Sequence, residues 1–105
     1  MKENEYQQEL VEKIYGLMPG QRFLDKIVMI NDANYIQGIP DLSVFYRVTG
    51  RFAMLEVKTS EKSPVRPNQQ WYIDEWGKYI FTSFIYPENE EEVLRELQVF
   101  LTQGA

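Results

Sequence analysis

Residues 41 to 58 of this chain read Asp-Leu-Ser-Val-Phe-Tyr-Arg-Val-Thr-Gly-Arg-Phe-Ala-Met-Leu-Glu-Val-Lys. The β-branched and aromatic residues on either side of the central glycine predict two strands, 42 to 48 and 52 to 58, joined by a tight turn. In such a hairpin Asp41 and Glu56 come to the same end of one sheet. The hairpin therefore sets the centre of the fold and places two carboxylates close together.

The rest of the chain supplies helices and strands on both sides of this hairpin. In chain order we predict a helix over residues 4 to 18, a strand over 26 to 30, the hairpin, a helix from Pro67 to Gly77, a strand over 79 to 86 and a helix over 90 to 101. The strand–helix–strand step after the hairpin implies a right-handed crossover to a parallel neighbour. The expected fold class is α/β, of order α-β-β-β-α-β-α, with one mixed four-stranded sheet flanked by helices in a single domain, residues 1 to 105.

Composition excludes several kinds of chemistry. The chain has no cysteine and no histidine, which removes disulfides, thiolate zinc sites, Ser-His-Asp triads and histidine-bound metals. No apolar run approaches the roughly 18 residues of a membrane span, and the acidic start does not resemble a signal peptide. We therefore expect no membrane partner and a cytosolic location.

Charge is unevenly distributed along the chain. The net charge of −5 argues against a nucleic-acid partner when it is taken globally. Between Arg47 and Arg66, however, there are five bases and two acids, whereas five acids and one base lie between Glu88 and Glu96. The modest basic region predicts weak, salt-sensitive binding, or a dimer that pools two such regions.

The end of the hairpin carries the candidate chemistry. Because side chains alternate along a strand, Glu56 and Lys58 share one side while Val57 enters the core. Carboxylates of Asp41 and Glu56, with the backbone carbonyl of Val57, are hard oxygen ligands suited to Mg²⁺ or Mn²⁺. A nearby ammonium can align or deprotonate a water, so this set fits metal-dependent cleavage of a phosphodiester.

The wider motif resembles the PD-(D/E)xK nuclease superfamily. The residues that carry the resemblance are Gly38-Ile39-Pro40-Asp41-Leu42, then Glu56-Val57-Lys58, then Gln69. The closest similarity is to the VRR-NUC branch, to small phage-encoded nucleases and to Holliday junction resolvase-like enzymes. The resemblance implies a restriction-endonuclease-like core in which Asp41 and Glu56 bind metal, Lys58 assists the water and Gln69 supports the site.

The same resemblance implies an acidic residue from the first helix. Glu3 and Gln7 lie one helical turn apart on one side, so Glu3 is the first candidate and Glu9 the second. Glu5 and Glu12 stay open as alternatives.

Contacts to nucleic acid are predicted from residues near the motif. Lys62 and Arg66 are candidate phosphate contacts, and Asn34 and Tyr35 are close enough to Asp41 in sequence to line a substrate groove.

These observations predict a Mg²⁺- or Mn²⁺-dependent DNA endonuclease, structure-selective for branched or duplex DNA and acting as a homodimer. The alternative is a non-catalytic nucleic-acid-binding or assembly subunit on the same fold, motivated by the acidic balance and by the 14% aromatic content. RNA stays open as a substrate because no residue identifies a reader of the 2′-hydroxyl.

Overall fold

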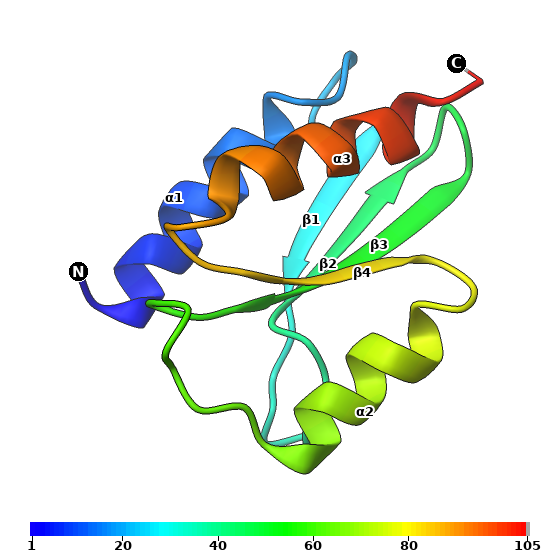
Figure 1. Ribbon diagram of the computed structural model, residues 1–105. Coiled ribbons are helices and arrows are strands. Elements are labelled where there is room, and N and C mark those ends of the chain that lie inside the picture. The colour runs from blue at the N-terminus through cyan, green and yellow to red at the C-terminus, as the bar shows by residue number, and fades with distance from the viewer. Residues whose placement is uncertain (105) are drawn as a thin grey trace.

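The computed structural model describes residues 1 to 104, and a four-stranded sheet lies at its centre with helices on both faces (Figure 1). In chain order the elements are α1 (Glu3–Tyr15), β1 (Lys26–Ile30), β2 (Leu42–Tyr46), β3 (Arg51–Val57), α2 (Pro67–Trp76), β4 (Phe81–Ile85) and α3 (Glu90–Thr102). The predicted α/β class and the order α-β-β-β-α-β-α are confirmed.

The sheet is mixed, and its strand order is β1-β2-β3-β4. Strands β1, β2 and β3 form an antiparallel meander, whereas β3 and β4 are parallel, as the predicted crossover requires. The hairpin register pairs Leu42 with Leu55 and Tyr46 with Arg51. Asp41 therefore directly precedes β2, at the end of the sheet where β3 finishes with Glu56 and Val57.

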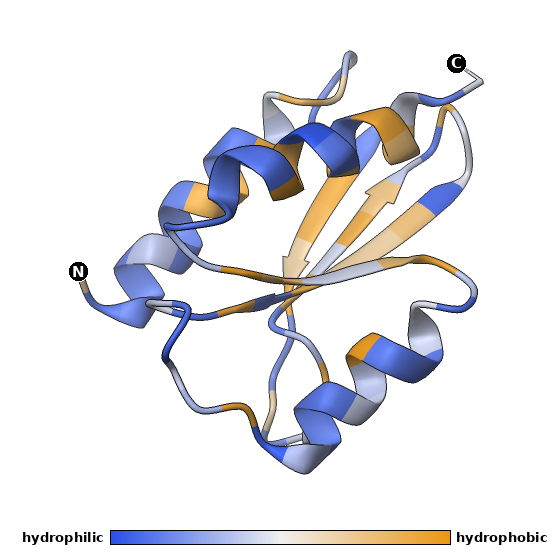
Figure 2. Cartoon of the chain, in the orientation of Figure 1, coloured by the Kyte–Doolittle hydropathy of each residue, from blue (hydrophilic) through white to orange (hydrophobic). Residues whose placement is uncertain are grey.

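The main core lies between the sheet and the layer of α1 and α3, while α2 covers the other face near β4 (Figure 1). Its fully buried residues include Leu10 of α1, Leu42 and Leu55 of the hairpin, and Leu97 of α3. Figure 2 shows hydrophobic strands and predominantly hydrophilic outer surfaces on α1 and α3. Helix α2 has no fully buried residue. Within residues 1 to 104, no helix combines the length and the apolar character that crossing a bilayer demands.

Two elements end earlier than predicted. Helix α1 ends at Tyr15, where the Lys26 ammonium donates to the Tyr15 carbonyl at 2.8 Å. Strand β2 ends at Tyr46 because the hairpin turn begins there, and the N–H of Gly50 donates to the carbonyl of Tyr46 at 2.8 Å. The turn therefore begins earlier than predicted.

Strand β4 is also shorter than predicted. The N–H groups of Tyr79 and Ile80 both donate to the carbonyl of Trp76 at 3.0 Å, so a turn continues from α2 until Phe81. The almost wholly apolar run from Tyr79 to Tyr86 is typical of a strand that is covered on both faces. However, β4 is an edge strand, and only Ile85 is fully buried in it.

Gly38 fixes the path of the loop that leads into β2. Its φ of +86° lies in the left-handed region, and a Cβ at this position would lie 2.6 Å from the Cβ of Asn68 in α2. The loop that carries Asp41 is thus packed directly against the first turn of α2.

We expect Gly38→Ala to lower the free energy of unfolding by about 2–3 kcal/mol, because it adds a steric overlap to the cost of left-handed backbone. Gly50→Ala is the matched control, since Gly50 also has a positive φ, +73°, but has nothing within 4 Å of the added Cβ. It should lose only about 1 kcal/mol. Urea denaturation measures both, and equal losses would contradict the packing role of Gly38.

Candidate functional site

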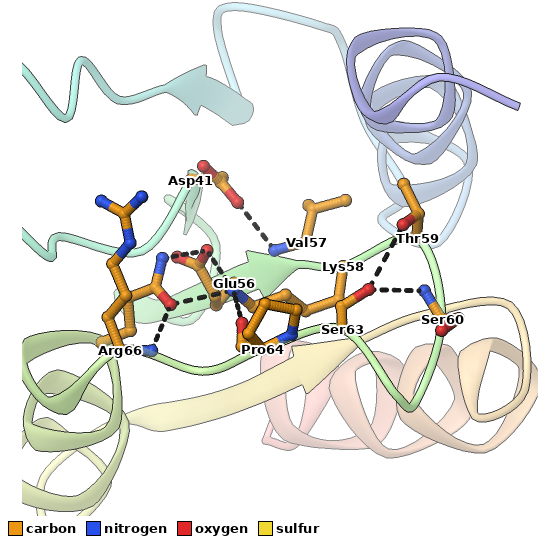
Figure 3. A network of polar contacts seen from close by, with 10 residues as sticks. Asp41, Glu56, Val57, Lys58, Thr59, Ser60, Ser63, Pro64 and Arg66 are labelled. Carbon is orange, nitrogen blue, oxygen red and sulfur yellow. Dashed lines mark hydrogen bonds and ion pairs between the residues drawn. The ribbon is translucent and has the colours of Figure 1, made fainter.

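Two carboxylates meet at the end of the hairpin. Oδ2 of Asp41 accepts a hydrogen bond from the N–H of Val57 at 2.8 Å, which links the start of β2 to the end of β3 (Figure 3). The neighbouring Glu56 is only 3% exposed, while Asp41 is half-buried. The hairpin geometry predicted from sequence thus places the two acids at one end of the sheet.

Gln69 of α2 connects this end of the sheet to the helix. Its Nε2 donates to Oε2 of Glu56 at 3.1 Å, and its Oε1 accepts from the Lys58 ammonium at 2.8 Å. The same Oε1 accepts from the N–H of Arg66 at 3.0 Å, as a side chain at the third position of a helix does in a capping box. One carboxamide therefore begins α2 and orients two of the charged groups.

Lys58 lies one residue beyond β3, and both its backbone and its side chain make hydrogen bonds. Its N–H still donates to the carbonyl of Ile85 at 2.9 Å, so the strand direction continues through it. The side chain is 12% exposed, and its ammonium donates to the carbonyl of Pro64 at 3.0 Å and lies 3.8 Å from Oε2 of Glu56. The ammonium also donates to Gln69, so it makes two hydrogen bonds and one longer ion pair with Glu56.

The environment of Glu56 changes its protonation. Burial, followed by the negative charge of Asp41, raises the pKa of Glu56 from 4.5 to about 8, although the charge of Lys58 acts in the opposite direction. Near neutral pH the pair Asp41–Glu56 therefore retains a proton. A divalent cation between the two groups would supply the positive charge that this proton now supplies.

The donor atoms present fit a small hard cation. Because N–H and C=O of one strand residue point to the same neighbouring strand, the carbonyl of Val57 is directed toward the side of Asp41, to which its N–H donates. Asp41, Glu56 and this carbonyl give the oxygen-only set that Mg²⁺ prefers, and Mg²⁺ retains several waters when it binds few protein ligands.

Glu3, the first residue of α1, lies within electrostatic reach of this end of the sheet. Loss of hydration and then the charge of Asp41 raise the pKa of Glu3, while Lys58 lowers it. Of the other candidates from the first helix, Glu12 is paired with Arg22 at 3.0 Å. Nowhere in residues 1 to 104 do three Asp, Glu, His or Cys side chains gather closely enough to hold a metal, so Glu3 does not complete such a cluster.

Asn31 is a site-supporting residue that the sequence analysis did not identify. Its Nδ2 donates to the carbonyl of Pro40 at 2.9 Å and to Oγ of Ser43 at 2.7 Å, and its N–H donates to the carbonyl of Asp41 at 2.7 Å. The strand register could have identified Asn31. Because Ile30 pairs with Leu42, the residue that follows Ile30 lies beside the residue that precedes Leu42, which is Asp41.

The predicted nucleic-acid contacts are exposed. Lys62 and Arg66 belong to the loop that connects β3 to α2, next to the site. Asn34 and Tyr35 lie in the loop before β2, where Tyr35 is 89% exposed and its N–H donates to the carbonyl of Asp32. All four are accessible to a ligand, but no contact joins them to the two acids.

The basic region predicted from sequence does not form one surface. Arg47 pairs with Asp25, and the guanidinium of Arg51 lies over the ring of Phe100, 5.0 Å from its centroid. Both arginines are at the turn end of the hairpin, opposite to the site. Of the five bases in this region, only Lys58, Lys62 and Arg66 lie at the end of the sheet that carries Asp41, in the loop between β3 and α2.

Comparison with protein-family models, with curated proteins and with solved structures finds no match to this chain. The resemblance to PD-(D/E)xK nucleases consequently stays a prediction, and it is supported only by the motif and by the geometry of its residues.

The raised pKa of Glu56 has a measurable effect on stability. Unfolded Glu56 releases its proton near pH 4.5 and the folded group only near pH 8, so this group stabilises the fold fully below pH 4.5 and that contribution is lost as the pH rises to 8. Without metal, Glu56→Gln should be more stable than wild type by about 1–2 kcal/mol at pH 8, with a smaller difference at pH 5.

Urea denaturation in EDTA at the two pH values measures this difference. Glu91→Gln, at an exposed position of α3, controls for the change in net charge. A difference between Glu56→Gln and wild type that does not depend on pH would contradict the assignment.

Proposed function

We propose that this chain is a metal-dependent nuclease that hydrolyses phosphodiester bonds of DNA and that its core is of the restriction-endonuclease-like kind. The observation that carries the proposal is the convergence of Asp41, Glu56, Lys58 and Gln69, from three separate elements, at one end of the sheet. A buried glutamate beside a second carboxylate costs folding free energy when both groups are ionised, and this cost supports a functional role for the pair.

Each residue has a defined task in this proposal. Asp41 and Glu56, with the Val57 carbonyl, would hold Mg²⁺ or Mn²⁺, which would polarise the scissile phosphate and acidify a bound water. Gln69 keeps Oε2 of Glu56 and the Lys58 ammonium in fixed positions through its two hydrogen bonds. Glu56 must lose its proton to act as a ligand, so binding of the cation releases a proton.

Lys58 supplies positive charge where the phosphate becomes more negative in the transition state. Its ammonium donates hydrogen bonds to Gln69 and Pro64 and lies 3.8 Å from Glu56, which is beyond hydrogen-bond distance. Exchange of this long contact for the attacking water or for a phosphate oxygen would leave both hydrogen bonds intact.

The homodimer belongs to the same proposal. Helix α2 lies over β4 and leaves the same side of the sheet open over β1 and β2. The exposed apolar residues there are Ile27, Met29 and Phe45, and Phe45 stacks on Phe52 with ring centroids 4.6 Å apart. A second copy placed on this apolar face would bury it and bring two sites into one particle, as a branched substrate requires.

Cleavage of labelled DNA tests the proposal. With Mn²⁺, we expect wild type to cut at least one of duplex, single-stranded, flap and four-way substrates, and Asp41→Ala and Lys58→Ala to reduce the rate by about 100-fold or more. Lys78→Ala is the control, because Lys78 is an exposed lysine paired with Glu75 at the far end of α2. Equal cutting by all four proteins would place the activity outside this site, and no cutting of any substrate by wild type would overturn the proposal.

A second candidate is a non-catalytic nucleic-acid-binding or assembly subunit on the same fold. The hydrogen bonds that tie the Lys58 ammonium to Pro64 and Gln69 favour it, as does the lack of a third acid at the site within residues 1 to 104. Such a subunit has no need to bind a divalent cation.

Metal binding separates the two candidates. At a fixed Mn²⁺ concentration near 100 times the Kd at pH 8, the nuclease proposal predicts a rise in the Tm of wild type of about 10–15 °C, and a smaller rise at pH 6 because Glu56 must deprotonate. Asp41→Asn should lose this rise, whereas Asp74→Asn, on the outer side of α2, should retain it. A Tm of wild type that ignores Mn²⁺ would favour the binding subunit.

A further inference from the structure

A second concave site lies beside the candidate catalytic residues. It is a pocket of about 420 Å³ between the loop that joins β3 to α2, one side of α2, and strand β4. Residues from all three segments line it, among them Lys58, Ser63, Val65, Gln70, Ile73 and Phe84. Its volume lies within the range that small-molecule and cofactor sites occupy.

The loop wall of this pocket is built by its own hydrogen bonds (Figure 3). Oγ of Ser63 accepts from the N–H of Ser60 at 3.2 Å and lies 3.3 Å from Oγ1 of Thr59. The N–H of Ser63 donates to the carbonyl of Ser60 at 3.1 Å, and the Lys58 ammonium holds the carbonyl of Pro64. The pocket is therefore formed before any ligand binds.

The lining favours an uncharged, flat group over a phosphate. Lys58 is the one cation among the described residues that line the pocket, and its ammonium already donates to Gln69 and Pro64 and is paired with Glu56 at 3.8 Å. Glu61 adds a negative charge to the wall. Ile73 and Phe84 supply apolar surface, while hydroxyl and amide groups such as that of Gln70 supply hydrogen bonds. Apolar faces with polar groups at the edge are the usual surroundings of a nucleobase.

The position of the pocket relates it to the two acids. Glu56 of β3 pairs with Phe84 of β4, and Phe84 and Lys58 both line the pocket, so the pocket lies directly beside Glu56. Neighbouring strands are about 4.8 Å apart, which puts the pocket roughly 5–10 Å from the acids. This is the reach of the nucleotide next to a phosphate at the metal site that Asp41 and Glu56 would form.

We infer that this pocket binds the base of an unpaired nucleotide adjacent to the scissile phosphate. The inference rests on the proposed function and deepens it, because a paired base is stacked inside a duplex and cannot enter a pocket at the side of the protein. The substrate class is thus DNA with at least one unpaired nucleotide at the cut, as in single strands, flaps and junctions.

The binding test uses the trinucleotide d(TTT) and the same trinucleotide without its middle base, each added to the ¹⁵N-labelled protein in EDTA. We expect d(TTT) to shift the amide signals of Ser63, Gln70 and Phe84, and the abasic analogue to bind about tenfold more weakly. Gln70→Trp, which fills the mouth of the pocket, should abolish the shifts. Asp74→Trp is the matched control, since it breaks the same hydrogen bond between Gln70 and Asp74 but lies outside the pocket.

The outcomes separate this inference from the nuclease proposal. Equal binding of both trinucleotides, an absence of shifts at the pocket, or wild-type binding by Gln70→Trp would overturn the pocket assignment even if wild type cleaves DNA with Mn²⁺. Shifts that require the middle base and are blocked by Gln70→Trp would support it even if no substrate is cleaved, in which case only the nuclease proposal falls.

Discussion

The burial of the Glu56 carboxyl is the constraint on which the arrangement of the site depends. A carboxyl group at 3% exposure needs hydrogen-bond partners and a nearby positive charge or a proton. Gln69 and Lys58 are these partners, and Gln69 reaches Glu56 only when the start of α2 lies over the end of β3. The position of α2 and the cap at Arg66 are therefore tied to this one side chain.

The hairpin and its chemistry could be predicted because they depend on short-range rules. Alternation along a strand places Glu56 and Lys58 on one side, and a two-strand register places Asp41 beside them. The role of Gln69 was implied by the resemblance, and its predicted place in the first turn of a helix that begins at Pro67 is confirmed. The fold class followed equally well, since the crossover to β4 has only one common topology.

What the sequence did not reveal depends on contacts between distant segments. The carbonyl at the end of α1 accepts a hydrogen bond from Lys26, a contact that no local propensity reports. Asn31 resembles a turn residue until the strand register is known. The separation of Arg47 from the site requires the direction of each strand, because bases close in sequence can lie at opposite ends of a hairpin.

Helix α2 combines a central role with weak anchoring. It contributes no fully buried residue to the core, whereas α1 and α3 each contribute several. Local opening costs least where few apolar groups are buried, so the amide protons of α2 should exchange with solvent faster than those of the other two helices. Each such opening removes Gln69 from Glu56 and admits water, which lets the carboxyl ionise at lower pH. Motion of this helix and release of a proton at the centre of the site are therefore one coupled event.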